Sequence, residues 1–299
     1  MKSNLTSKKV VLTSFFVDTL DIIFNGAIAF STGSSIMLAE FLQGLADLVT
    51  VAFLYIGIKR SVKRADREHS FGYGRELYFW SLCSAIIMFA GTATLSFYFG
   101  YRKFANPEPI SNYFLAYFIL SIGIVSNIYA LFLSIRQLKS SGEKSGIWKN
   151  FIASNLVEIK ATFISDLMGS CAAFFGIIAL IIYGITGNAQ FDGLGAMFIG
   201  VTIAIFSIFL IKEIKDLIIG KSASPEIVRK IRQITEEIPG VSDIIDLRTM
   251  HFGSEKIQVN LSIRIKDELN TDEITSLIDN LETKIENSIP EIDDVQIEV

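Results

Sequence analysis

The stretch Ser34–Val51, SSIMLAEFLQGLADLVTV, decides how the rest of the chain is interpreted. It lies in an apolar run long enough to cross a membrane, yet it contains Glu40, Gln43 and Asp47. Gln43 and Asp47 are four residues apart, so on a helix they share one face and lie about 6 Å apart along the axis. A charge at the bilayer centre costs roughly 2.5 kcal/mol or more unless it faces a cavity or a partner. The stretch therefore predicts a helix that turns a polar stripe toward the interior of a bundle.

A second apolar stretch, residues 155–172, has the same character. Its sequence, NLVEIKATFISDLMGSCA, places Glu158, Thr162 and Asp166 four residues apart on one helical face. We interpret the protein as a membrane helix bundle that holds a cation between these two helices. Asp47 and Asp166 lie deepest in their apolar runs, which favours a functional role for both.

The candidate metal ligands from the two stretches carry only oxygen donors: Gln43, Asp47, Thr162 and Asp166. Two carboxylates can neutralise one divalent ion. Oxygen ligands suit Mn²⁺, Mg²⁺ or Fe²⁺, whereas imidazole and thiolate favour Zn²⁺ and copper. Two neighbouring carboxylates do not both stay ionised cheaply without a cation, so such a pair can exchange a metal ion for protons.

The first apolar run also has a polar face. Asp18, Asp21 and Asn25 occupy positions i, i+3 and i+7, so they line one side of a helix. With Glu158, they are candidates for the wall of a hydrated cation or proton path. The alternative is that a buried acid here serves only as a structural hydrogen-bonding group.

The composition indicates a membrane protein with a polar tail. The 299 residues are 51% apolar, and the mean hydropathy is +0.46. Residues 224–299 hold 17 acidic and 8 basic side chains, while the remainder holds 14 acidic and 19 basic ones. We therefore expect a membrane domain over residues 1–215 and an acidic cytoplasmic domain over 216–299, with no nucleic-acid partner.

Hydropathy predicts six membrane spans, and loop charges predict their orientation. The loops over 59–75 and 136–155 are rich in lysine and arginine, whereas the opposite side carries only Arg102 and Lys103. By the positive-inside rule, both termini are cytoplasmic. The predicted spans are 10–31, 35–58, 76–101, 112–135, 156–185 and 192–212.

The tail has the pattern of a small αββαβ, ferredoxin-like domain. Ser224-Pro225-Glu226 predicts a helix start, and Asn270 or Thr271 predicts the cap of a second helix that Pro290 stops. Alternating apolar residues predict strands, and a domain of this size has a small core that association would help. The predicted strands are 243–250, 256–265 and 295–299.

Several motifs together resemble one family. The segment His69–Arg75, HSFGYGR, resembles the HPFGxGR-like signature of the cation diffusion facilitator family, and it follows the second span as it does there. Six spans, paired residues at xxxD spacing in spans two and five, Asp192 at the start of span six and an αββαβ tail are similar to that family as well. The resemblance implies a homodimer that exports divalent metals in exchange for protons.

The same resemblance assigns candidate sites and exposes departures from the family pattern. The positions of the central ligands correspond to the four oxygen-donor residues above, but the family typically has Asp or His where Gln43 stands and His where Thr162 stands. A loop metal site would correspond to Asp66 and His69, with Tyr73 in place of a second histidine. In the tail, the residues at the metal-ligand positions of zinc-binding relatives differ from the family pattern, and they are Ile245, Asn260 and Glu298. The resemblance therefore implies that the tail metal sites are mostly lost. We expect the remaining histidine, His251, to lie on the surface.

These observations predict proton-coupled export of divalent cations, Mn²⁺ or Fe²⁺ ahead of Zn²⁺, by a homodimer in the cytoplasmic membrane. Asp47 and Asp166 would be the exchanged carboxylates, and no enzymatic activity is expected. The alternative is a non-transporting relative that acts as a metal sensor or dimerisation partner. An intramembrane aspartyl protease is disfavoured because neither aspartate belongs to a GxGD element.

Overall fold

The computed structural model describes residues 19–140, 146–153, 156–253, 256–266 and 269–299. The chain forms two compact units, which are described separately. One unit takes residues from 1–54, 81–150 and 158–212, and the other takes residues from 55–80, 151–157 and 213–299. The boundaries between the units fall within helices, so each unit contains part of the apolar helical region.

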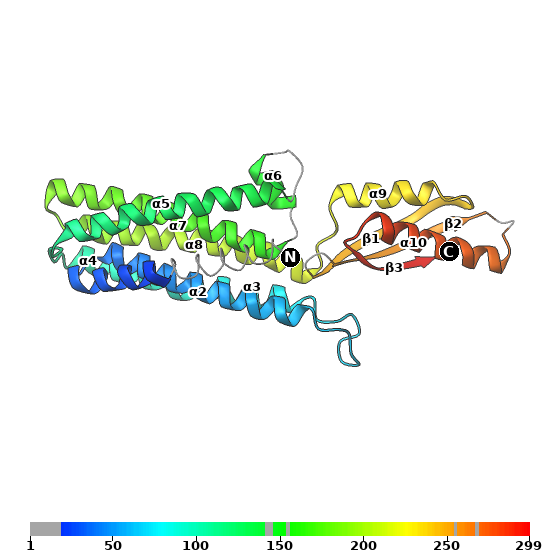
Figure 1. The fold of residues 1–299 in the computed structure, drawn as a ribbon, viewed down its shortest axis with the longest axis horizontal. Coiled ribbons are helices and arrows are strands. Elements are labelled where there is room, and N and C mark those ends of the chain that lie inside the picture. The colour runs from blue at the N-terminus through cyan, green and yellow to red at the C-terminus, as the bar shows by residue number, and fades with distance from the viewer. Residues whose placement is uncertain (1–18, 141–145, 154–155, 254–255, 267–268) are drawn as a thin grey trace, which may run out of the picture. The chain divides into compact units, whose positions relative to one another are not determined.

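Apolar helices dominate the first two thirds of the chain (Figure 1). Among the residues that the structure describes, five helical stretches are long and apolar enough to cross a membrane, and Thr19–Thr32 forms a shorter apolar helix where the first predicted span lies. The fold class predicted from the sequence is thus confirmed. The helices are α2 (Ser35–Ser61), α3 (Glu76–Ile87), the π-helical η1 (Met88–Ala93), α4 (Thr94–Ala105), α5 (Tyr113–Ser140), α6 (Ile147–Ala153), α7 (Val157–Thr186) and α8 (Gln190–Ile219).

The region between α5 and α7 differs from the expected loop over 136–155. Helix α5 continues to Ser140, and a short helix, α6, follows over Ile147–Ala153. Trp148 of α6 makes edge contacts with Phe163 of α7 and Phe209 of α8, with ring centroids 6.2 Å apart in each case. These contacts pack α6 against α7 and α8, in a region where the polar composition alone indicated a loop.

A buried carboxylate fixes the start of α2. Asp192, in the first turn of α8, is fully buried. It accepts hydrogen bonds from the Ser34 hydroxyl at 2.6 Å and from the backbone N–H groups of Ser35 at 2.6 Å and Ile36 at 3.2 Å. The first N–H groups of a helix have no partner within the helix, so Asp192 satisfies two donors that would otherwise be buried and unpaired. The charge of Lys103 also acts on this carboxylate.

Glycines bring α4 and α8 into close contact. A Cβ on Gly193 would lie 2.6 Å from the backbone nitrogen of Phe104, and one on Gly200 would lie 2.8 Å from that of Phe97. On the facing helix, a Cβ on Gly100 would lie 2.7 Å from the Gly193 carbonyl oxygen. Small residues let membrane helices approach this closely. The third and last spans therefore pack backbone to backbone, which leaves no room for larger side chains at these three positions.

The third span departs from regular α-helix beside the polar stripe of α2. Its middle is the π-helical segment η1, which includes Met88 and Thr92. The Thr92 hydroxyl donates to the Leu42 carbonyl oxygen at 3.4 Å, and the Thr50 hydroxyl contacts the Met88 sulfur at 3.6 Å. Single π-helical turns are frequent at functional sites. Here the turn lies against the part of α2 that carries the predicted ligands.

The tail is the predicted αββαβ domain. The strands form one sheet in the order β1-β2-β3, with β1 and β2 antiparallel and β2 and β3 parallel. Apolar residues at every second position of β2 pack against both helices to form the core. As predicted, Ser224 caps the first helix and Asn270 the second. The elements are α9 (Pro225–Glu236), β1 (Val241–Gly253), β2 (Lys256–Ile265), α10 (Thr271–Ser288) and β3 (Ile292–Glu298).

The buried cap at the start of α2 yields a stability prediction. Asp192→Asn replaces one acceptor oxygen with an N–H donor, so one of the two capped backbone N–H groups or the Ser34 hydroxyl faces another donor. We expect the free energy of unfolding to fall by roughly 1–3 kcal/mol. The measurement is thermal unfolding of the full chain in mild detergent. Asp216→Asn, on the same helix with its side chain 47% exposed, is the matched control. Equal shifts in the two variants would contradict the capping role.

Candidate cation site

Each of the two central aspartates accepts a hydrogen bond from a serine of a neighbouring helix. The Ser165 hydroxyl of α7 donates to Asp47 Oδ1 of α2, and the Ser134 hydroxyl of α5 donates to Asp166 Oδ2 of α7. Both aspartates are half-buried. The two contacts join α2 to α7 and α5 to α7, so carboxylate and hydroxyl oxygens gather in the interior of one bundle.

Gln43 lies deeper than either aspartate. Its side chain is 4% exposed, and its Nε2 lies 3.1 Å from where a Cβ on Gly169 of α7 would be. Its carbonyl oxygen, Oε1, has no hydrogen-bond partner among the described residues. A buried acceptor without a donor is costly, at roughly 1–3 kcal/mol. The oxygen is therefore available to a water molecule or a cation beside the two carboxylates.

Thr162 lies differently from the other three predicted ligands. It is exposed in the single chain, and its hydroxyl donates to the Glu158 carbonyl oxygen of its own helix at 2.8 Å. Sequence reasoning did not single out Ser134 or Ser165. Their hydroxyls carry no signal in the sequence, because serine is common in membrane helices and only packing shows which serine meets an acid.

The predicted ligands of the bundle and the two serines offer oxygen donors. The part of the chain that the structure describes has no group of three or more His, Cys, Asp or Glu side chains that could hold a metal ion. A cation bound here would therefore rest on two carboxylates supplemented by amide and hydroxyl oxygens. That combination matches hard and borderline divalent ions better than soft ones.

The candidate path residues lie near the start of the bundle. Asn25 is 5% exposed and donates to Asp21 Oδ2 at 2.9 Å, while Asp18 lies outside the described residues. Glu40 of α2 is 8% exposed, and the charges of Asp21 and Asp47 both act on it. Acidic groups thus follow one another from the first helix along α2.

Glu158, the fourth path candidate, lies apart from these residues along the sequence. It is half-buried in the first turn of α7. A carboxylate there is also stabilised by the helix dipole.

The loop between α2 and α3 holds the predicted Asp66 and His69 site. Asp66 Oδ2 accepts from Lys63 Nζ at 2.9 Å and from the Tyr73 hydroxyl at 2.7 Å. His69 Nδ1 lies 3.7 Å from Asp66 Oδ1. The hydrogen bond from Lys63, helped by the one from Tyr73, holds the pKa of Asp66 well below its usual range. The positive charge beside this carboxylate is therefore the Lys63 ammonium.

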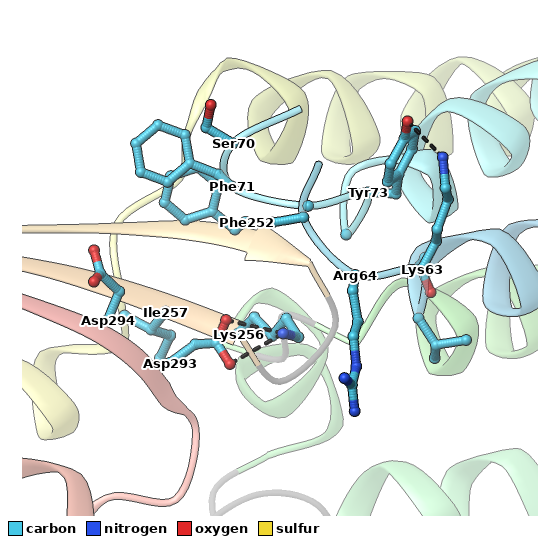
Figure 2. A pocket seen from close by; sticks show the side chains of 15 residues that line it. Lys63, Arg64, Ser70, Phe71, Tyr73, Phe252, Lys256, Ile257, Asp293 and Asp294 are labelled. Carbon is cyan, nitrogen blue, oxygen red and sulfur yellow. Dashed lines mark hydrogen bonds and ion pairs between the residues drawn. The ribbon is translucent and has the colours of Figure 1, made fainter. Parts of the chain in front are cut away.

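The end of the same loop contacts β1 of the tail. Figure 2 shows the Phe71 ring beside that of Phe252, and the two centroids are 5.1 Å apart. A Cβ on Gly74 would lie 2.6 Å from the Phe252 carbonyl oxygen, so only glycine fits there. Arg75 lies over the Phe252 ring at 5.0 Å. A cavity of about 350 Å³ lies between the loop and the strands, bordered by Lys256 and its ion-pair partner Asp293.

The tail positions that correspond to metal ligands in relatives are solvent-exposed. Ile245 is 58% exposed, and Asn260 and Glu298 are exposed on β2 and β3. The weak or absent tail zinc expected from the sequence stays a prediction.

His251 is not a surface residue, as the sequence suggested, but is 3% exposed. The expectation was wrong because β1 extends to Gly253 and carries His251 into the packed end of the strand. Neither ring nitrogen has a hydrogen-bond partner among the described residues. Burial, together with the nearby charge of Lys221, lowers the pKa of His251 to about 4.

A bundle of apolar helices with acidic and amide side chains in its interior, joined to an αββαβ tail, defines the class: a multi-pass membrane protein with a candidate cation site. Comparison with known proteins identifies the family. Residues 11–219 match the cation efflux transmembrane domain, and residues 223–299 match the cytoplasmic domain of cation efflux proteins. The chain belongs to the cation efflux, or cation diffusion facilitator, family.

Individual relatives are distant. The chain is 27% identical over 257 residues to the mouse proton-coupled zinc antiporter SLC30A9, mitochondrial, with 85% of this chain and 45% of that protein covered. It is 23% identical over 255 residues to metal tolerance protein C4 of Arabidopsis thaliana, with 83% and 54% covered. It is 23% identical over 290 residues to the magnetosome protein MamB of Magnetospirillum gryphiswaldense, with 97% and 92% covered. The chain therefore spans about half the length of the first two.

The buried histidine makes the stability of the tail depend on pH. The folded pKa of about 4 lies below the ordinary value of 6.5, so protonation favours the unfolded state. The contribution is fully present above about pH 6.5 and is lost as the pH falls toward 4. We expect His251→Leu to reduce the loss of stability between pH 7 and 5 by about 1–2 kcal/mol.

The measurement is denaturant unfolding of the full chain at both pH values. His69→Leu, which replaces a histidine whose side chain is 51% exposed, is the matched control and should keep the wild-type dependence. If His251→Leu loses as much stability as wild type, another group is responsible for the pH dependence.

Proposed function

We propose that the protein exports divalent cations from the cytoplasm in exchange for protons, by alternating access. The observation that carries the proposal is the pair of aspartates, Asp47 and Asp166, each bonded to a serine of a neighbouring helix within one bundle. Membership of the cation efflux family supports it. So does the likeness to a protein named as a proton-coupled zinc antiporter, although the chain covers 45% of that relative.

The chemistry follows from charge balance. Without a metal ion, two carboxylates in one apolar bundle do not both stay ionised cheaply, so at least one carries a proton. A divalent ion stabilises both charged forms and displaces that proton. The Ser165 and Ser134 hydroxyls donate to the two acids, and the same oxygens carry lone pairs that can turn toward a cation.

The assembly and location follow from other parts of the chain. Cytoplasmic termini are supported by the basic loops, through the positive-inside rule, and by the match of the tail to a family described as a cytoplasmic domain. We propose a homodimer joined through the tails, in the cytoplasmic membrane of a bacterial-type cell. No enzymatic role is included.

A second candidate function is a non-transporting metal sensor or dimerisation partner. It is favoured by the donor set, since the described residues offer no cluster of three acidic, histidine or cysteine side chains around one point. Metal-driven proton flux in sealed vesicles separates the two functions, because a sensor binds metal without moving protons.

The ion preference is the first prediction of this proposal. Both histidines, His69 and His251, lie outside the apolar helices, and the four predicted ligands of the bundle offer oxygen donors. We expect Mn²⁺ or Fe²⁺ to drive more transport than Zn²⁺ at equal concentration. The measurement is a metal panel in proteoliposomes, with and without a proton gradient. A wide margin for Zn²⁺ would overturn the preference and bring this chain into line with its zinc-antiporter relative.

The second prediction concerns coupling. Asp47→Asn and Asp166→Asn each remove half of the charge that neutralises a divalent ion. We expect both variants to lose metal-driven proton release while remaining folded, because a neutral amide in an apolar bundle costs less than an unpaired charge. The measurement is the pH inside vesicles that contain a trapped indicator, recorded after metal is added.

Thr162→Ala is the matched control for these variants. It removes a polar group from the same face of α7, but that hydroxyl is exposed and already bonded to its own helix. We expect it to weaken metal affinity more than it weakens coupling, so proton release should persist at saturating metal. Full proton release in either Asn variant would rule out the aspartate pair as the exchanger and would direct attention to Asp18, Asp21 and Glu158.

A further inference from the structure

The loop between α2 and α3 is organised around the ammonium group of Lys63. The ammonium nitrogen lies 2.9 Å from Asp66 Oδ2 and 2.8 Å from the Tyr73 hydroxyl oxygen. It also lies 4.0 Å from the centroid of the Tyr73 ring, within the range of a cation–π contact. Figure 2 shows the lysine directed at this tyrosine. One cation thus bridges two residues that are seven positions apart in the loop.

The Asp66 carboxylate has no acceptor capacity left over for a metal ion of ordinary coordination. Its Oδ2 accepts from Lys63 and Tyr73, and its Oδ1 accepts from the backbone N–H groups of Glu68 at 3.1 Å and His69 at 2.9 Å. An ionised carboxylate offers about four lone-pair sites, so these four donors fill it. A metal could bind only after several of these bonds had broken.

The other predicted ligand of the loop is also engaged. The His69 ring packs against the Tyr73 ring, with centroids 4.2 Å apart. Its Nδ1 lies 3.7 Å from Asp66 Oδ1, beyond ordinary hydrogen-bond distance. The positive charge of Lys63 beside Asp66 would also repel an arriving divalent ion. The residues of this loop therefore do not fit the metal site that Asp66 and His69 suggested in the sequence.

We propose that Lys63 is the resident cation of the loop and takes the structural role that a bound metal ion would have. It neutralises Asp66, closes the loop on Tyr73 and leaves the following residues, Phe71 and Gly74, in the conformation that contacts Phe252. The shape of the loop is then independent of the metal concentration. This inference does not depend on the proposed transport activity.

The test compares lysine variants of the full chain in mild detergent. The parent for this test is the Asp47→Asn, Asp166→Asn double variant, so that metal binding within the bundle does not contribute. Every further variant is made in this parent. Lys63→Met keeps most of the aliphatic chain and removes the charge. Lys59→Met, on an exposed residue near the end of α2, removes the same charge without touching the loop network.

The first readout is amide hydrogen exchange over residues 66–73. We expect exchange in Lys63→Met to be at least about threefold faster than in the parent, because several contacts of the loop are lost together, whereas Lys59→Met leaves it unchanged. Equal exchange in the two lysine variants would overturn the proposal, since the loop would then hold its shape without Lys63.

The second readout is titration of the parent with Zn²⁺ alone. We expect His69→Ala to leave the number of bound zinc ions unchanged, because the loop of the parent binds none. A zinc ion that binds the parent and is lost in His69→Ala would show that metal displaces Lys63 and would overturn the proposal. Neither readout depends on transport, so failure here leaves the proposed function to its own flux assay.

Discussion

The buried carboxylate of Asp192 is the interaction on which the arrangement of the helices around α2 depends. It replaces the missing hydrogen-bond partners of Ser35 and Ile36 and so fixes the first turn of α2 against α8. A buried charge without such donors would destabilise the bundle strongly, so the helix start and the aspartate require each other. Gln43 and Asp47 lie farther along the same continuous helix, about two and three turns beyond this end.

Along α2 and α7, the cost of burying polar groups in an apolar bundle is lowered because neighbouring helices supply hydrogen-bond partners. Ser165 and Ser134 serve the two aspartates, while the Gln43 carbonyl oxygen remains without one among the described residues. The hydrogen-bond satisfaction of these groups is therefore uneven. A fully paired network stabilises the fold, whereas an unpaired buried acceptor costs free energy that a bound cation or water molecule would offset.

In the second unit, the interactions that close the loop before α3 differ in kind from those that join it to the tail. The loop is closed by charge, through Lys63 and Asp66, and its contact with β1 is made by rings and glycine, through Phe71, Phe252 and Gly74. Exposed charge pairs are weak and screened by salt, whereas close backbone contact tolerates no larger residue. The loop is therefore held by charge at its start and by close steric contact at its end.

The sequence by itself determined the apolar helices, the αββαβ tail and the positions of Asp47 and Asp166 within their helices. Hydropathy, alternation and i, i+4 spacing are local properties of the chain. Caps such as Ser224 and Asn270 were also readable for this reason. Only the tertiary structure decided which serine hydroxyl donates to which aspartate and that the Thr162 hydroxyl donates to its own helix. It also decided that the Lys63 ammonium bonds to Asp66 and that His251 is buried. Those outcomes depend on contacts between residues far apart in the sequence or on the direction of a side chain, and no local pattern encodes them.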